Sequence, residues 1–182
     1  MKRNRLCSSW AKVLGCVLLV VDLAACRSTV RVPDAAQPTA QQASVFPDFR
    51  DVVIPPNIAP LNFQVNNPAE EVVVQIKGQR GEPLVAEAET AGKLRFDSTE
   101  WRRLLTDNRG GQLSVEVFTQ HEGQWLQHPA CKWTVAAEPI DSFLTYRLIE
   151  PSYELYRQLG LYERNLTNFD EHPIYENNDT FE

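Results

Sequence analysis

Short segments in which every second residue is apolar recur through the middle of this chain, and turn residues separate them. The alternation is clear over residues 72–77, 84–88 and 113–117, and Cys131, Trp133 and Val135 share one face of a further segment. Because successive side chains of a strand point to opposite faces, this pattern predicts half-buried β-strands. Short strands with a turn every ~8–12 residues favour an immunoglobulin- or fibronectin-III-like β-sandwich.

Further strands and turns fit the same scheme. Residues 52–63 are apolar but carry three prolines, which predicts an edge strand or the entry to a strand, because proline cannot donate to a strand ladder. Residues 93–96 predict another short strand. Hairpin turns are expected at residues 78–81 and 121–124.

One short helix is expected between the strands. Asp97 followed three residues later by Glu100 resembles a capping box at a helix start. Trp101, Leu104 and Leu105 then fall on one helical face, and residues 108–111, which include two glycines, end the pattern. The fold class predicted is therefore mainly β, with one inserted helix.

Residues 1–25 have the organisation of an export signal. Three of the first five residues are basic, and residues 13–23 are apolar apart from Asp22. This run is shorter than the ~20 residues that a membrane-spanning helix needs. It fits the apolar region of a signal peptide, which is typically ~7–15 residues long.

The string Leu23-Ala24-Ala25-Cys26 resembles the lipobox of bacterial lipoproteins. In that family the cysteine thiol is acylated, and cleavage leaves this cysteine as the first residue of the mature chain. The resemblance implies lipid attachment at Cys26, including palmitate-type chains, and two or more chains anchor a protein stably. The alternatives are an ordinary secretory signal cut after Ala25 and an uncleaved anchor.

Residues 26–46 are rich in Pro, Ala, Gln, Ser and Thr and show no periodicity, which predicts a flexible linker. No acidic run follows Cys26 directly. By analogy with lipoproteins of Bacteroidetes, this favours an outer-membrane anchor that faces the periplasm. Of the four cysteines, Cys131 is the one thiol expected in the mature body, so no disulfide within the chain is expected.

The sandwich is expected over residues 47–138, and a tyrosine-rich extension over residues 139–182. All five tyrosines lie in the extension. Pro151 suits the first turn of a helix, and Tyr153, Tyr156 and Leu159 follow at helical spacing. The extension is therefore predicted to be partly helical, with a frayed, acidic end from residue 168 onward.

Candidate binding residues lie in this extension. Tyrosine and arginine are enriched where proteins bind one another. The candidates for partner binding are Tyr146, Arg147, Tyr153, Tyr156 and Tyr162. The alternative is that these side chains clasp the chain's own sandwich, because tyrosine often packs with its hydroxyl in water.

Two strings, residues 47–63 and residues 140–151, together with residues 165–171, resemble the N-terminal region of a Bacteroidetes family of exported TolB-like proteins, often described as cytochrome c biosynthesis proteins. In that family the region precedes a Cys-x-x-Cys-His haem motif and a β-propeller of the TolB/PD40 type. The present sequence has no Cys-x-x-Cys-His, and covalent haem needs both thiols. The resemblance therefore implies a short member, a truncated copy or one part of a split gene.

Motifs for catalysis and metal binding are not found. His128 and Cys131 form a His-x-x-Cys pair, but His121 and His172 lack the spacing of further ligands, so we expect no metal. Cys131 is expected to be a small buried apolar residue, and His128 is expected on a loop. Asp170, Glu171 and His172 are expected in a solvated loop. The sequence thus indicates neither an enzyme nor a cofactor.

Three functions are weighed. The formal net charge of −6 argues against nucleic-acid binding. We favour a non-catalytic lipoprotein of the cell envelope that acts as a protein-interaction or scaffold module. The alternative is a subunit of a haem c/TolB-like redox lipoprotein whose haem and propeller lie on another chain. A weaker alternative is a carbohydrate-binding sandwich that uses Trp101, Trp125 or Trp133, whose apolar-face positions argue against exposure.

Overall fold

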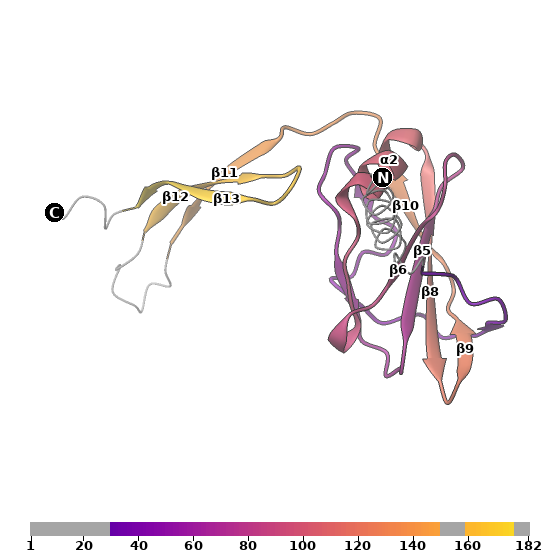
Figure 1. Ribbon diagram of the computed structural model, residues 1–182. Helices are drawn as coiled ribbons and strands as arrows, with labels where there is room; N and C mark the ends of the chain where they lie inside the picture. Colours follow the sequence, from indigo (N-terminus) through magenta and orange to yellow (C-terminus); the bar gives the residue numbers. More distant parts are fainter. Residues whose placement is uncertain (1–29, 150–158, 177–182) are drawn as a thin grey trace, which may run out of the picture. The chain divides into compact units, whose positions relative to one another are not determined.

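The computed structural model describes residues 30–149 and 159–176 of the chain (Figure 1). The chain divides into two compact units, Met1–Val30 and Arg31–Glu182, and the described strands belong to the second. The lipobox and Cys26 lie outside the described residues, as do Tyr153 and Tyr156. In the described part, no helix is long and apolar enough to cross a membrane.

The largest sheet has seven strands and is organised around the ten-residue strand β8 (Gln112–His121). Antiparallel to β8 lie β5 (Val72–Lys77), β9 (Gln124–Gln127) and β10 (Cys131–Val135). The strand β6 (Leu84–Glu87) forms a hairpin with β5. Two-residue strands pair in parallel at the margins, β1 (Gln37–Pro38) with β9 and β3 (Val53–Ile54) with β10. The predicted proline-rich edge strand is therefore confirmed at β3.

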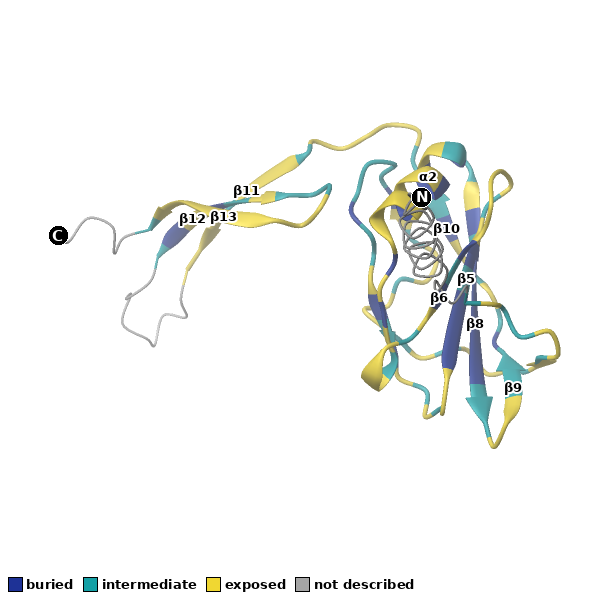
Figure 2. Cartoon of the chain, in the orientation of Figure 1, coloured by how far each residue is buried: buried dark blue, intermediate teal, exposed yellow. Residues whose placement is uncertain are grey.

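A second sheet has three strands in the order β2 (Val45–Phe46), β4 (Phe63–Val65) and β7 (Lys93–Leu94). A short 3-10 turn, η1 (Thr90–Gly92), precedes β7. Phe63 of β4 packs edge-on against Trp133 of β10, with ring centroids 6.2 Å apart. One buried cluster contains apolar side chains of both sheets, as the dark blue strands of Figure 2 illustrate. The predicted mainly β fold with two packed sheets is thus confirmed.

The predicted helix is α2 (Ser98–Asp107). The Asp97 carboxylate accepts hydrogen bonds from the backbone amides of Thr99 and Glu100, at 2.9 and 3.0 Å. These amides have no partner within the helix, so the cap stabilises its first turn. The apolar face predicted from the sequence, Trp101, Leu104 and Leu105, is buried in the core.

The prediction of a flexible linker up to residue 46 is wrong for its second half. β1 and β2 lie within that range and pair with β9 and β4. The backbone amide of Thr39 donates to the carbonyl of Gln127 at 2.9 Å, and Ser44 exchanges hydrogen bonds with Asn66 and Asn67. Backbone pairing of this kind needs no apolar periodicity, which is why composition alone misses it.

The extension after the sandwich is described over residues 139–149 and 159–176. Its described residues form a third sheet, here called the C-terminal sheet, with β11 (Phe143–Leu148), β12 (Gly160–Asn165) and β13 (Glu171–Glu176) in sequence order. The residues expected to be helical, 151–158, lie outside the described part. The predicted frayed end is wrong for β13, because five of its six residues pair with β12 and the sixth, Ile174, lies in the bulge. The antiparallel ladder supplies backbone partners that the polar composition of this stretch does not reveal.

Candidate functional site

The C-terminal sheet brings two of the predicted tyrosines together. Tyr146 of β11 lies directly opposite Tyr162 of β12, and the rings stack with centroids 5.9 Å apart and planes 24° from parallel. Aromatic pairs of this geometry stabilise beyond the area that they bury. The sequence places these residues sixteen positions apart, and the strand register makes them neighbours.

Both hydroxyls are held by carboxylates of β13. Tyr162 donates to Glu176 at 2.6 Å, and Tyr146 donates to Glu171. Arg164 of β12 forms an ion pair with the same Glu171 carboxylate. The cluster therefore connects all three strands. Each hydroxyl has a carboxylate acceptor, and the Glu171 carboxylate also has a cationic partner in Arg164.

These contacts shift the pKa values of the cluster in directions that favour protonated hydroxyls and an ionised Glu171. The hydrogen bond from Tyr146, followed by that from Arg164, lowers the pKa of Glu171 below its usual value. The hydrogen bond to Glu171 raises the pKa of Tyr146, and the hydrogen bond to Glu176 raises that of Tyr162. A protonated hydroxyl beside an ionised carboxylate is a positioning contact, and it gives neither tyrosine the character of a nucleophile.

Gly160 makes room for this cluster. A Cβ atom at this position would lie 2.5 Å from the Tyr162 ring, closer than packed atoms approach. Gly160 is buried and pairs with Leu148 and Glu176. The absence of a side chain at Gly160 therefore lets the Tyr162 ring cover the backbone of its own strand.

Much of the same sheet is exposed (Figure 2), and its exposed residues include several apolar side chains. Leu161 and Tyr175, which are 41% and 46% exposed, lie in one row with the exposed Arg147 on one face. The other exposed apolar residues of its strands are Phe143, Leu144, Leu148 and Ile174. Exposed apolar groups gathered on a small sheet indicate a surface that contacts another macromolecule.

Sequence reasoning missed the polar half of this cluster, Arg164, Glu171 and Glu176. It also placed His172 in a solvated loop, whereas His172 lies in β13 with its Nε2 3.3 Å from a Glu163 carboxylate oxygen. A signal was present in residues 165–170. Asn165 and Asn168 cap their own turn there by accepting from Thr167 and Asp170.

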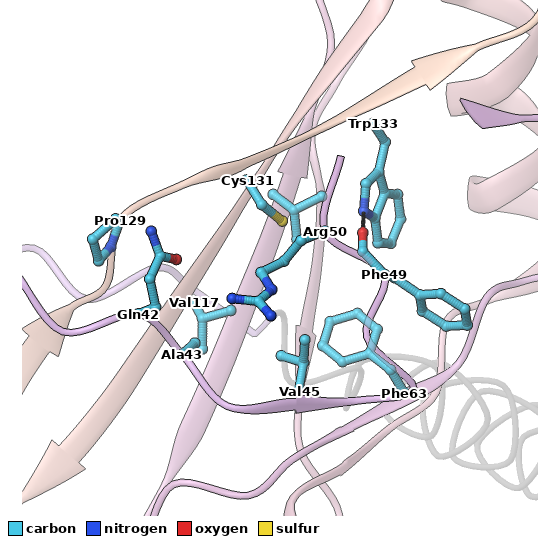
Figure 3. Close-up of a pocket in the computed structure, with 11 residues that line it drawn as sticks. Gln42, Ala43, Val45, Phe49, Arg50, Phe63, Val117, Pro129, Cys131 and Trp133 are labelled. Carbon is cyan, nitrogen blue, oxygen red and sulfur yellow. Dashed lines mark hydrogen bonds between the residues drawn. The ribbon is translucent and has the colours of Figure 1, made fainter. Parts of the chain in front are cut away.

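A small apolar pocket lies between the sheets of the sandwich (Figure 3). Its walls include Phe49, Phe63, Cys131 and Trp133, and the indole of Trp133 donates to the carbonyl of Phe49 at 2.5 Å. The cavity measures about 20 Å³, the size of a single water molecule. It is a gap in the packing and is too small for an organic ligand.

The charged side chain of this pocket, Arg50, already has a partner. Arg50 binds Asp48 through two hydrogen bonds of 2.7 and 2.5 Å, which lower the pKa of Asp48 to about 2. Burial raises the pKa of the Cys131 thiol, so the reactive thiolate is disfavoured there. Cys131 is half-buried and contacts the core, in keeping with the apolar role expected from the sequence.

His128 lies on a loop, as expected, but its side chain is buried and its two ring nitrogens have separate partners. Nδ1 donates to the carbonyl of Gln41 at 2.8 Å, and Nε2 contacts the Thr119 hydroxyl at 2.9 Å. A carbonyl can only accept, so Nδ1 carries a proton in this contact. His128 therefore fastens the segment before β2 to the large sheet.

Two of the three tryptophans considered for carbohydrate binding are buried. Trp101 and Trp133 are each 1% exposed and cannot serve as stacking platforms, and Trp125 is half-buried. Over residues 30–149 and 159–176, no group of three or more His, Cys, Asp or Glu side chains is placed to hold a metal ion. No family model, curated protein or solved structure matches the chain.

Proposed function

We propose that this chain is a non-catalytic lipoprotein of the bacterial cell envelope, anchored through Cys26, whose C-terminal sheet binds another envelope protein. The observation that carries the proposal is the exposed apolar surface of the C-terminal sheet, with Leu161 and Tyr175 beside Arg147. Aromatic, apolar and arginine side chains are the types that dominate protein interfaces. We interpret the sandwich, which we regard as immunoglobulin- or fibronectin-III-like, as the rigid support for this surface.

The cluster behind the surface supports a binding role. A sheet of three strands has little core of its own, and hydrogen bonds from Tyr146 and Tyr162 to β13 hold its strands in register. A surface that is ordered before binding loses less conformational entropy when a partner docks. The geometry suits recognition, and the sandwich pocket, at about 20 Å³, is too small for an organic ligand.

The anchor rests on the sequence string Leu23-Ala24-Ala25-Cys26. It is tested by expressing the full chain in a bacterium and weighing the N-terminal peptide by mass spectrometry. We expect cleavage before Cys26 and an acylated cysteine, and the Cys26→Ser variant loses the acyl mass. An unmodified thiol at Cys26 in the mature chain would overturn the anchor.

The partner is tested by pull-down of the full chain from solubilised envelope. The variant Leu161→Ser/Tyr175→Ser removes apolar surface from the C-terminal sheet. The matched control is Val53→Ser, because Val53 is 69% exposed on β3 of the sandwich. The proposal predicts a co-purifying protein that is lost with the double variant and kept with the control.

The identity of that protein decides between the two readings of the family resemblance. A haem- or propeller-bearing protein would make this chain a subunit of a redox lipoprotein, as the resemblance to TolB-like proteins implies. Any other envelope protein would favour an independent scaffold. Both results keep the interaction role of the C-terminal sheet.

A further inference from the structure

The two outer strands of the C-terminal sheet, β11 and β13, differ in how far their free edges are blocked. β13 carries Pro173, a register shift opposite Leu161 and Tyr162, and the acids Glu171 and Glu176 at its ends. Proline, irregular pairing and charge are the devices that keep a sheet edge from pairing with another chain. β11 has no proline, no acid and regular pairing over its six residues, and among the described strands only β12 pairs with it, which leaves its outer edge open there.

The strand register defines which backbone groups β11 presents at this edge. Leu166 donates its backbone N–H to the carbonyl of Ser142 at 2.7 Å, so Ser142 faces β12. Along an antiparallel strand, the backbone N–H and C=O groups of successive residues point alternately toward and away from the neighbouring strand. The backbone groups of Phe143, Thr145 and Arg147 therefore point away from β12. These three residues form the template for an added strand.

We propose that the strand added at this edge is β11 of a second copy, paired antiparallel about a twofold axis at Thr145. In this register Phe143 lies opposite the second copy's Arg147, Thr145 lies opposite itself, and Leu144 lies opposite Tyr146. Each is a favourable cross-strand pair, with the guanidinium placed against an aromatic ring and two threonines side by side. The sequence of β11 is thus complementary to its own reverse.

Charge and the length of paired strand together favour this register over its neighbours. An axis at Arg147 sets the two guanidinium groups directly opposite one another, and an axis at Tyr146 makes them diagonal neighbours. The axis at Thr145 separates them by four residues along the ladder. An axis at Leu144 separates the two arginines further but pairs only Phe143–Thr145 of β11, whereas the axis at Thr145 pairs Phe143–Arg147, so the axis at Thr145 is favoured.

The dimer is expected to be reversible. Pairing of two six-residue strands buries less than the ~1,600 Å² of a standard interface, which predicts a concentration-dependent equilibrium. The inference rests on the proposed function in one respect, because anchoring at Cys26 would confine both copies to one surface and raise their effective concentration. The pairing itself does not require the lipid.

The test is disulfide trapping of the full chain in its own membrane. Every variant carries Cys131→Ser, and Thr145→Cys is then added. Paired Cα atoms within ~7 Å of one another can form a disulfide. We expect Thr145→Cys to give a covalent dimer on oxidation, whereas Arg147→Cys gives one only when it is co-expressed with Phe143→Cys.

The controls separate this inference from the anchor. If Cys26 is not lipidated, its free thiol can form a disulfide-linked dimer in the chain that carries Cys131→Ser alone. Such a dimer would show that lipidation is incomplete, and Cys26→Ser would remove it. The proposed pairing is overturned if a folded Thr145→Cys chain stays monomeric. It is also overturned if Arg147→Cys alone gives as much covalent dimer as Thr145→Cys.

A second variant uses the outward direction of the Thr145 amide. Thr145→Pro removes one N–H from the free edge and leaves the hydrogen bonds to β12 in place. In sedimentation velocity of the full chain in detergent, we expect Thr145→Pro to abolish the dimer and Thr145→Val to keep it. A dimer that survives Thr145→Pro, with β11 folded, contradicts the inference.

Discussion

The ring of Tyr162 stacks on that of Tyr146 across β11 and β12, with 5.9 Å between the centroids, while each hydroxyl donates to a different carboxylate of β13. These two side chains thereby connect all three strands of the C-terminal sheet. A change at either ring is expected to loosen the whole C-terminal sheet and leave the sandwich core intact.

Tyr162→Leu tests this link. It removes the stacking and the hydrogen bond to Glu176, and it leaves that carboxylate without its donor. Aromatic stacking contributes ~0.5–1.5 kcal/mol. We expect faster amide hydrogen exchange throughout β11, β12 and β13, with exchange in β8 unchanged. Tyr162→Phe is the matched control, since it keeps the ring and loses the hydroxyl; equal exchange in Tyr162→Leu and wild type would refute the link.

Acidification should weaken the same sheet through Glu171. Its pKa is lowered from a usual value of 4.5 by the hydrogen bonds of Tyr146 and Arg164. A carboxyl whose pKa is depressed in the folded state contributes stability that is fully present above the unfolded value and is lost as pH falls through the folded value.

We therefore expect exchange in β13, corrected for its intrinsic pH dependence, to rise below pH ~4.5 in wild type. In Glu171→Gln it should already be raised at neutral pH and should change less on acidification. The same acid response in both proteins would show that another group is responsible.

His128→Ala should release the segment before β2 from the large sheet. The change leaves the Gln41 carbonyl and the Thr119 hydroxyl without their partner. A buried polar group left unsatisfied costs ~1–3 kcal/mol. We expect a lower free energy of unfolding and new protease cleavage near Gln41. His121→Ala is the control; cleavage that is unchanged in His128→Ala would mean that backbone pairing alone holds the segment.

Gly78 and Asn108 should behave as a coupled pair. The buried Asn108 amide bonds to the carbonyls of Arg80 and Leu104 and accepts from the Arg80 N–H, joining the end of α2 to the β5–β6 hairpin. A Cβ at Gly78 would lie 2.2 Å from Asn108 Cγ.

Gly78→Ala is therefore expected to destabilise the wild-type protein strongly and the Asn108→Ala protein much less. Urea unfolding of the single and double variants measures the coupling, which for residues in contact is ~0.5–3 kcal/mol. Additive losses of stability would show that the two positions are independent.

The sandwich was predictable from the sequence because its strands alternate and its helix carries a cap. Val74, Ile76 and Val115 are buried as that alternation predicts, and Asp97 caps α2. These are local signals, and each is reinforced by burial in one core.

The C-terminal sheet was not predictable by the same means. Leu161 and Tyr175 are exposed on it, so no buried face imposes alternation, and Pro173 in β13 argues against a strand. Tyr146 and Tyr162 were identified as binding candidates by residue type, whereas their acceptors Glu171 and Glu176 come from strand register, which the sequence does not encode locally. For the same reason the contact between His128 and Gln41 was missed.

The central claim is that the C-terminal sheet binds a protein in the envelope. The most direct measurement is quantitative mass spectrometry of proteins that co-purify with the full chain, comparing wild type, Leu161→Ser/Tyr175→Ser and Val53→Ser. The account predicts at least one protein that is retained by wild type and Val53→Ser and lost from the double variant. An identical set of proteins on all three chains, each shown to be folded, would contradict it.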